Sequence, residues 1–347
     1  MKVIHVINSL EIGGAQKLLS DLIPLQIKQG LEVSVLIGED KESTLSHNIQ
    51  SAGCNIISID SKHLKSPKSI ISIRKIIKGY DIIHVHLFPS LYLVAVASLG
   101  LRNKLIYTEH STSNRRREKK YLRQIEKFIY KQYHKIASIS QPTQTALQNW
   151  LKSYDSRFVV INNGIDIRKF SSAKRPIQNK SLIMISRFVE AKDQATVINA
   201  LQYLDSDVSL TLVGDGENLD KCKNLAKSIG VDNRVHFLGS RSDIPELISS
   251  SYIGIQSSNW EGFGLTAVEL MAAGKPVIAS NVDGLKQVVE GAGIIFDKGN
   301  PKQLAEKIKV LLNDKNLYDS VSNKCIMRAS QFDIKDMAEK YLHIYTN

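Results

Sequence analysis

EGFGLTAVELMAAGKP, residues 261–276, is the stretch that decides how this chain is organised. Apolar residues recur at helical spacing from Leu265 onward, and Gly274 followed by Pro276 is a normal helix end. We therefore predict a short helix that begins near Gly264 or Leu265. It follows a β-branched strand and precedes another, which is the pattern of a βαβ unit.

The start of this helix has the chemistry of an anion site. Gly262 and Gly264 let backbone N–H groups approach a ligand closely, and the unpaired donors and positive dipole of a helix N-terminus favour phosphate. Glu269, about one turn inside, could accept hydrogen bonds from ribose hydroxyls, and Glu261 would be aimed at a sugar. A glycine-rich turn with two solvated glutamates is the alternative reading of this spacing.

Short β-branched runs alternate with helix-period segments over nearly the whole chain, which favours parallel sheets built from βαβ units. We predict seven strands in the first half, at residues 3–7, 32–37, 55–57, 82–84, 104–107, 136–139 and 159–161. Six more are predicted in the second half, at residues 182–185, 209–213, 235–237, 253–256, 277–279 and 294–296. The fold class is therefore α/β, with two Rossmann-like doubly wound parallel sheets whose ligands bind at the carboxyl ends of the strands.

A chain of 347 residues is too long for one ordinary core and suits two domains. We place them at residues 1–168 and 169–330, with a polar linker over 166–180. A last helix, about residues 331–347, is expected to pack back on the first domain.

The bulk composition indicates a cytoplasmic protein whose first half is basic. The three cysteines are far apart and outside any Cys-x-x-Cys pair, which favours a reducing compartment without disulfides or zinc. No apolar run is long enough to span a bilayer, and residues 1–7 read as a buried strand instead of a signal peptide. Of the net charge of +12, residues 1–166 carry +10, with 23 Lys and Arg against 13 Asp and Glu. Either an anionic partner or a solvated basic face would explain this asymmetry.

Two cations follow the first predicted strand of the second domain. Arg187 and Lys192 flank a strand-to-helix turn, where they can neutralise a diphosphate leaving group and remove the need for a metal. A structural salt bridge is the alternative. In the first domain, Gly13 and Gly14 shape the corresponding turn, but they do not form the Gly-x-Gly-x-x-Gly fingerprint of a nicotinamide enzyme.

Histidines end two strands of the first domain. His84 and His86 share one face of their strand, a spacing that would suit a metal, but no third ligand is apparent nearby, so we predict no metal site. His110 follows the next strand and is the alternative candidate for contact with the ligand.

The motifs together resemble the donor site of retaining glycosyltransferases of the GT-B fold, particularly family 4. The resemblance covers almost the whole chain and rests on residues 261–276 together with Gly13-Gly14-Ala15, Asn163-Gly164-Ile165-Asp166, Ser186-Arg187 with Lys192, residues 213–217 and Phe237-Leu238-Gly239. It implies two domains that face a cleft, a nucleoside-diphosphate sugar, with UDP favoured, as co-substrate, and neither cofactor nor metal. It also implies front-face displacement, with the leaving phosphate helping to deprotonate the acceptor.

The resemblance implies roles for individual residues. Glu261, His110, Arg187 and Lys192 would act at the reacting centre, His110 by contacting the transferred sugar. Residues expected to bind the donor are Gly13, Gly14, Gly239, Arg241, Gly262, Phe263, Gly264, Leu265 and Glu269, with Gly239 and Arg241 near the base. Glu109 occupies a position where many relatives have an aromatic residue or histidine, so its role stays open.

The acceptor is expected to be a lipid-linked or growing glycan of the cell envelope, such as lipopolysaccharide or capsule. Residues 114–136 combine many cations with an apolar stripe that we predict to be core: Tyr121, Leu122, Ile125, Phe128, Ile129 and Ile136. The cations around it, and a second basic segment containing Lys62, Lys65, Lys68, Arg74, Lys75 and Lys78, could lie against anionic lipid on the cytoplasmic face of a membrane.

Two other functions fit parts of this pattern. A sugar-nucleotide epimerase or hydrolase on the same fold would consume the sugar-nucleotide without an acceptor. A non-catalytic module could instead use the basic half on nucleic acid or membrane. The chain has no aromatic-rich RNA motif, so we expect no nucleic-acid partner.

Overall fold

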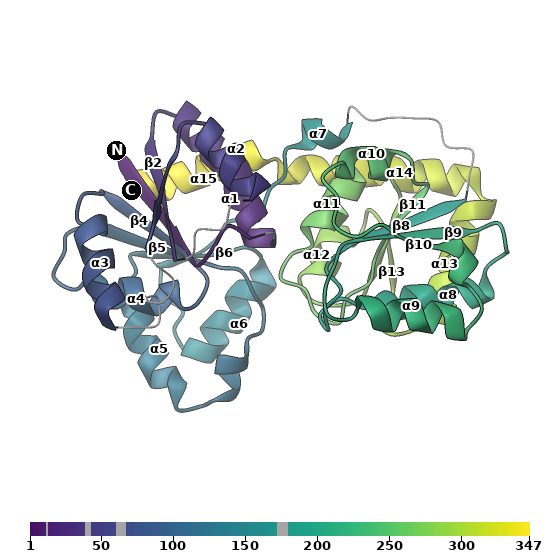
Figure 1. The fold of residues 1–347 in the computed structure, drawn as a ribbon, viewed down its shortest axis with the longest axis horizontal. Helices are drawn as coiled ribbons and strands as arrows, with labels where there is room; N and C mark the ends of the chain where they lie inside the picture. The colour runs from purple at the N-terminus through teal and green to yellow at the C-terminus, as the bar shows by residue number, and fades with distance from the viewer. Residues whose placement is uncertain (12, 39–42, 60–66, 172–179) are drawn as a thin grey trace. The chain divides into compact units, whose positions relative to one another are not determined.

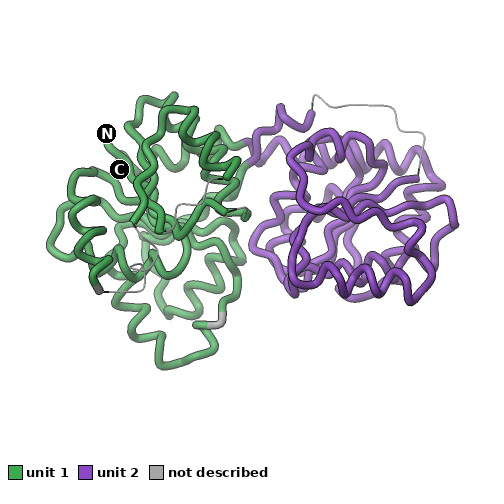
Figure 2. The backbone as a smooth tube through the Cα atoms, viewed as in Figure 1, with its two compact units in different colours: residues 1–164, 334–347 green, residues 165–333 purple. Residues whose placement is uncertain are grey.

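The computed structural model describes residues 1–11, 13–38, 43–59, 67–171 and 180–347. The chain forms two compact units, shown in different colours in Figure 2. Unit 1 comprises residues 1–164 and 334–347, and unit 2 comprises residues 165–333. The chain thus crosses between units after residues 164 and 333, where the sequence analysis placed the boundaries after 168 and 330.

Unit 1 is built on a parallel sheet of seven strands in the order β3-β2-β1-β4-β5-β6-β7. The strands are β1 (Lys2–Ile7), β2 (Glu32–Ile37), β3 (Asn55–Ser58), β4 (Ile82–His86), β5 (Lys104–Glu109), β6 (Lys135–Ser138) and β7 (Phe158–Val160). The helices are α1 (Gly14–Lys28), α2 (Thr44–Ser51), α3 (Pro67–Ile77), α4 (Ser90–Ala97), α5 (Leu122–Lys131), α6 (Gln141–Leu151) and α15 (Ile334–Thr346). Helix α15, the yellow C-terminal helix in Figure 1, packs beside α1.

The two faces of this sheet differ in chemistry. On β4, Ile83 and Val85 point into an apolar core that α3 and α4 complete with side chains such as Ile73 and Val94. The alternate residues of the strand point to the other face, because successive side chains of a strand alternate. That face carries histidines instead, and side chains of α1 and α15 contact them.

Unit 2 has a six-stranded parallel sheet in the order β10-β9-β8-β11-β12-β13. Its strands are β8 (Ser181–Ile185), β9 (Ser209–Val213), β10 (Val235–Phe237), β11 (Ile253–Gln256), β12 (Val277–Ser280) and β13 (Ile294–Phe296). Its helices are α7 (Ile167–Ser171), α8 (Gln194–Ala200), α9 (Leu219–Ser228), α10 (Ile244–Ser249), α11 (Leu265–Ala272), α12 (Leu285–Val289), α13 (Pro301–Asn313) and α14 (Lys315–Ala329). The 3₁₀ turn η5 (Ser330–Phe332) separates α14 from α15.

The predicted α/β fold is confirmed, since every predicted strand is present with its ends within two residues of the prediction. The proposed linker was partly wrong, because Ile167–Ser171 form helix α7, while residues 172–179 lie outside the described residues. The three cysteines are buried and free.

The apolar stripe predicted for residues 121–136 was also partly wrong. Ile129 and Ile136 are buried as expected, but Tyr121 is 68%, Ile125 49% and Phe128 55% exposed. The reason is that α5 turns Glu126, Ile129 and Tyr130 inward, so that Glu126 takes a buried place that the prediction gave to an apolar side chain. Of the basic segment before α3, Lys62 and Lys65 lie outside the described residues.

Candidate functional site

Unit 2 brings its candidate residues together where the strand order reverses. Strands β8 and β11 are neighbours there, and residues 186–193 and 257–264 follow their carboxyl ends. Backbone hydrogen bonds join the two loops, from Asn259 N to Ala191 O at 2.9 Å and from Asp193 N to Ser257 O at 3.2 Å. Open α/β sheets bind ligands at this kind of switch point.

The charged residues of these loops form one group. The Lys192 ammonium pairs with a carboxylate oxygen of Glu261, and the two side chains are 20% and 18% exposed. The Glu261 carboxylate also accepts from the backbone N–H of Gly262 at 3.3 Å. Arg187 is exposed, while its carbonyl is held by the Gln194 amide at 2.9 Å. The structure therefore joins Lys192 to Glu261 and leaves Arg187 reachable from solvent on the same loop.

Helix α11 begins as the sequence predicted, with Gly264 at its N-cap. Gly264 has a φ of +95°, and a Cβ there would lie 2.8 Å from the Leu285 side chain, so only glycine fits. Glu269, in the second turn of the helix, is 2% exposed. Leu265, the first helical residue, is half-buried.

Phe263 differs from the other predicted donor-binding residues of this loop. Its ring is 3% exposed and packs edge-to-face on Phe332, with the centroids 5.3 Å apart. The Phe263 side chain therefore anchors the loop to η5, and only the backbone of this residue is left for a donor contact.

The sequence analysis missed Gly284, which lies just before α12. It has a φ of +85°, and a Cβ would lie 2.7 Å from the Gly262 carbonyl carbon. Any larger residue would push the loop between Glu261 and Gly262 out of place. A glycine in the short loop that follows the predicted strand 277–279 was the available signal.

Three further glycines shape the same edge. Gly214 and Gly216, at φ of +134° and +147°, leave no room for a Cβ against the backbone of Ser186 and Phe188. They are therefore packing positions for the loop that carries Arg187. Gly239, at φ of +65°, accepts from Gly214 N at 2.8 Å. Arg241 lies on the surface in a two-pronged pair with Asp243, at 2.8 and 2.7 Å.

In unit 1, Gly13 and Gly14 follow β1 and begin α1. Gly13 is extended, with a φ of −166°, and a Cβ there would meet the end of the Gln16 side chain, which would have to move aside. This turn occupies the switch point of the unit 1 sheet, since β1 lies between β2 and β4.

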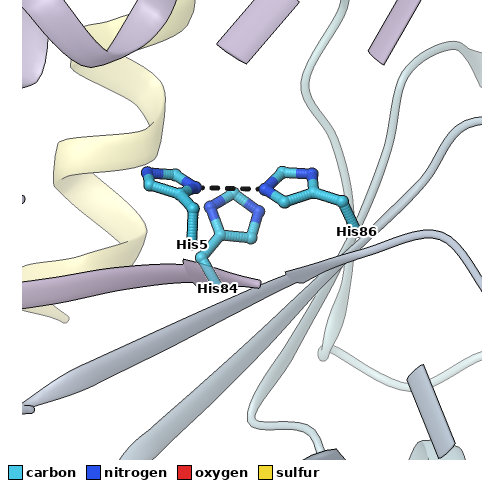
Figure 3. A group of neighbouring side chains, drawn as sticks. All are labelled: His5, His84 and His86. Atoms are coloured by element: carbon cyan, nitrogen blue, oxygen red, sulfur yellow. Dashed lines mark hydrogen bonds between the residues drawn. The ribbon is translucent and has the colours of Figure 1, made fainter. Parts of the chain in front are cut away.

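Four histidines share the polar face of this sheet. His5 and His84 are register partners on β1 and β4, and His86 and His110 continue the same face. Figure 3 shows His5, His84 and His86 clustered above these strands. Among the residues that the structure describes, these three have the spacing of metal ligands. Our expectation that His84 and His86 have no third ligand nearby was therefore wrong, because His5 is far away in the sequence but adjacent in the sheet.

Hydrogen bonds use each ring nitrogen of these three histidines. His5 contacts Gln26 Oε1 at 2.8 Å and His86 Nε2 at 3.1 Å, and His86 Nδ1 contacts His110 Nε2 at 3.1 Å. His84 contacts the Tyr345 hydroxyl at 2.6 Å and the Thr108 hydroxyl at 2.7 Å.

Burial keeps these histidines neutral. Desolvation lowers the pKa of His5 to about 4 and that of His110 to about 4. The pKa values of His84 and His86 are also lowered by desolvation and by the neighbouring imidazoles. The group is thus a set of neutral donors and acceptors at neutral pH.

Glu109, whose role was open, points to the opposite face of β5. Its carboxylate accepts from Arg117 at 2.8 Å and from the Tyr130 hydroxyl at 3.1 Å, and the residue is 4% exposed. Glu109 therefore forms a structural ion pair with Arg117. Of the two neighbours Glu109 and His110, only His110 lies on the histidine face.

Comparison with known proteins identifies the family. Residues 167–327 match the model of glycosyl transferases group 1, and residues 12–169 match that of glycosyltransferase family 4. An uncharacterized glycosyltransferase of Methanocaldococcus jannaschii is 30% identical over 76% of this chain and 77% of its own length. The Escherichia coli UDP-Gal:alpha-D-GlcNAc-diphosphoundecaprenol alpha-1,3-galactosyltransferase is 24% identical over 99% of this chain and 96% of its own length.

Other similarities are partial or concern the fold alone. The chain spans about three fifths of two further relatives, 60% of an uncharacterized Haemophilus influenzae glycosyltransferase and 62% of a Campylobacter jejuni N-acetylgalactosaminyltransferase named for a diphospho-undecaprenol acceptor. The Anabaena protein HepE, crystallised with UDP and glucose, has a TM-score of 0.89 at 23% identity, with all of both chains covered. Its likeness confirms the GT-B fold class. The chain therefore belongs to family 4 of the glycosyltransferases, the group 1 glycosyl transferases.

Proposed function

We propose that this protein transfers a hexose or N-acetylhexosamine from a UDP-sugar to a lipid-linked or growing cell-envelope glycan, with retention of the anomeric configuration. The observation that carries the proposal is the group of Arg187, Lys192 and Glu261 beside the start of α11, at the switch point of unit 2. A diphosphate needs cations and N–H donors, and this edge combines two basic side chains with the N-terminus of a helix.

The departing diphosphate would be stabilised by protein charges and without a metal. Lys192 is held by Glu261 on a loop that backbone hydrogen bonds fasten to the neighbouring loop, so its ammonium is positioned in advance. Arg187 would add a second cation, and the amides around Gly262 would add dipoles. Such preorganised charges are often the largest contribution to catalysis.

The nucleoside would lie along the same edge. The buried carboxylate of Glu269 suits the ribose hydroxyls, and the turn at Gly239 lies next to Gly214 at the ends of the adjacent strands. The HepE structure, with its bound UDP, supports a uridine donor on this fold. Arg241 would have to leave or share Asp243 to reach the base.

Retention would follow from front-face displacement. Glu261 is engaged by Lys192, which favours a positioning role over that of a covalent nucleophile. The acceptor oxygen would form its bond to the anomeric carbon as the bond from that carbon to the phosphate oxygen breaks. The leaving phosphate would take the acceptor's proton. Gly13, Gly14 and His110 of unit 1 would contact the transferred sugar.

The acceptor is proposed to carry a polyprenyl diphosphate anchor. The E. coli and C. jejuni relatives named above both have undecaprenol-linked substrates in their names. In the part of the chain that the structure describes, no helix has the length and apolar character needed to cross a bilayer. Instead, α5 exposes Tyr121, Ile125 and Phe128 on one side, close in sequence to exposed cations at Lys119, Lys120 and Lys131. We propose that this surface rests on anionic lipid at the cytoplasmic face.

The test is a transfer assay in which each of several UDP-, GDP- and ADP-sugars is offered with and without synthetic undecaprenyl-diphosphate-linked monosaccharides. The proposal predicts a new lipid-linked disaccharide from a UDP-sugar, formed equally well with EDTA. Consumption of the donor without any acceptor would favour an epimerase or hydrolase instead. Turnover only of GDP- or ADP-sugars would contradict the choice of base while leaving the reaction class intact.

A further inference from the structure

We propose that Gln26 sets, through His5 and His86, which ring nitrogen of His110 carries the proton. His110 would then present an unprotonated Nδ1, so it would accept a hydrogen bond from a hydroxyl of the transferred sugar. Gln26, His5 and His86 would act as positioning residues, at increasing distance from the substrate. This inference rests on the proposed function only for the role of His110, since the proton order itself belongs to the free protein.

The order follows from one fixed end of the chain of hydrogen bonds. The carbonyl oxygen of Gln26 can only accept, so Nε2 of His5 must donate to it across 2.8 Å. A neutral imidazole has one donor and one acceptor, so Nδ1 of His5 must accept. Nε2 of His86, 3.1 Å away, is therefore the donor of that bond.

The same rule applies to the last link. Because His86 donates from Nε2, its Nδ1 is an acceptor, and Nε2 of His110 donates to it across 3.1 Å. The single ring proton of neutral His110 is then on Nε2, in the bond to His86, and its Nδ1 keeps a lone pair. One amide oxygen on α1 thus determines the tautomer of three imidazoles: His5 on β1, His86 on β4 and His110 just after β5.

A second branch holds the Gln26 amide in this orientation. Its nitrogen donates to the Tyr345 hydroxyl on α15 at 3.1 Å, and that hydroxyl can donate onward to His84 Nδ1 at 2.6 Å. His84 Nε2 then donates to Thr108 at 2.7 Å. Rotating the amide by half a turn would require every proton in both branches to reverse.

Burial makes the order persistent. Gln26 and His5 are 0% exposed and His86 is 1% exposed, so water has little access to replace a missing partner. A protonated His5 would donate from both ring nitrogens, so its Nδ1–H would face the Nε2–H of His86 and no acceptor would remain between them. The depressed pKa values of His5 and His86 agree with a chain that stays neutral.

The chemical consequence is specificity for a hydroxyl donor. A sugar whose hydroxyl can donate to Nδ1 of His110 would be held, whereas a deoxy or fluoro analogue at that carbon would offer no proton. In the reversed order, Nδ1 would be a donor, and fluorine or a carbonyl would be tolerated better.

The test is nitrogen NMR of the free protein with isotope-labelled histidine, which reports the protonated nitrogen of each imidazole without any substrate. We expect Nε2 protonated and Nδ1 unprotonated for His5, His86 and His110 in the unmodified chain. In Gln26→Met, the anchor is lost, and the three signals should shift together towards a mixture of tautomers. Tyr341→Phe is the matched control, because the hydroxyl that it removes is buried on α15 and bonds to Thr108, outside the chain from Gln26 through His5 and His86 to His110. It should leave the three signals in place.

Protonated Nδ1 at His110 in the unmodified chain, or unchanged tautomers in Gln26→Met, would overturn the inference. So would one equivalent of zinc in the purified protein, since a metal would take nitrogens that the chain requires. The kinetic readout is secondary: Gln26→Met should lower kcat/KM for the UDP-sugar about tenfold, with the affinity for UDP unchanged. Because the NMR result needs no turnover, an inactive protein with the expected tautomers would count against the proposed function alone.

Discussion

The two units share a strand order but differ in the chemistry at the point where that order reverses. In both, the first six strands in sequence follow the spatial order 3-2-1-4-5-6. In unit 2 the candidate residues follow strands 1 and 4, whereas in unit 1 the glycines follow strand 1 and His110 follows strand 5. Unit 2 places an ion pair and an exposed arginine there, whereas unit 1 places glycines and buried neutral imidazoles. The fold determines where a ligand binds, and the residues at that edge determine which part of the ligand is recognised. In the proposed function, the diphosphate is therefore assigned to unit 2 and the neutral sugar to unit 1.

Removing the ammonium group of Lys192 in unit 2 should have the largest effect on catalysis. We expect Lys192→Ala to lower kcat about 100- to 1,000-fold, the usual cost of losing one preorganised group at a developing charge. Steady-state kinetics with a UDP-sugar and its acceptor would measure this. Lys315→Ala, which removes an 83% exposed lysine of the same unit, is the control and should keep full activity. Less than a fivefold loss in Lys192→Ala would contradict the role of Lys192 in neutralising the diphosphate.

Neutralising Glu269 should weaken donor binding more than it slows chemistry. A hydrogen bond to a charged group contributes about 1.5–3 kcal/mol, so Glu269→Gln should raise KM for the donor about 10- to 100-fold with a smaller change in kcat. Glu290→Gln, at an exposed pair with Lys286, is the matched control. A fall in kcat with KM unchanged would place Glu269 at the reacting centre instead of on the ribose.

Acid should destabilise unit 1 more than unit 2. The folded pKa of His5 is about 4 against an ordinary 6.5, so the unfolded chain binds more protons between these values. The free energy of unfolding is therefore full above about pH 6.5 and falls as the pH drops towards 4, by about 2 kcal/mol at pH 5 for His5 alone. Hydrogen exchange followed by mass spectrometry would locate the loss in β1, β4 and β5. If hydrogen exchange in β8 and β11 speeds up equally in acid, the buried histidines are not the cause of the lost stability.

The smallest effect concerns the surface around α5. Each cation near an anionic membrane contributes about 1 kcal/mol, so Lys120→Gln should weaken binding to phosphatidylglycerol vesicles about fivefold at low salt. Phe128→Ser should weaken vesicle binding more than Lys120→Gln does, because it removes an exposed aromatic ring that would insert among the lipids. Lys315→Gln on unit 2 serves as the control. If all three variants float with vesicles as the unmodified chain does, the membrane contact lies elsewhere.

The sequence allowed prediction of the parts that depend on local patterning. The strands follow from β-branched runs, and the start of α11 follows from the glycines before Leu265. The Lys192–Glu261 pair could be anticipated because both residues follow neighbouring strand ends.

What could not be predicted depends on pairing between distant segments. His5 lies beside His84 only because β1 pairs with β4, and Gln26 reaches them from a helix packed on that face. Gly284 matters because its own loop, 20 residues beyond Gly264, packs against the backbone of Glu261 and Gly262. The exposed side of α5 was predicted as core because its side chains are apolar. The structure instead buries Glu126 against Arg116, Tyr92 and Trp150, which reverses the ordinary preference for apolar residues inside.

The division of labour between the units can be tested most directly by calorimetric titration of UDP, without sugar or acceptor and with EDTA present. The account predicts that UDP binds the unmodified chain, binds about tenfold more weakly to Glu269→Gln, and binds His110→Ala with unchanged affinity. UDP that binds only when a divalent cation is supplied would contradict the metal-independent site. Equal weakening in His110→Ala and Glu269→Gln would contradict the assignment of the nucleotide to unit 2.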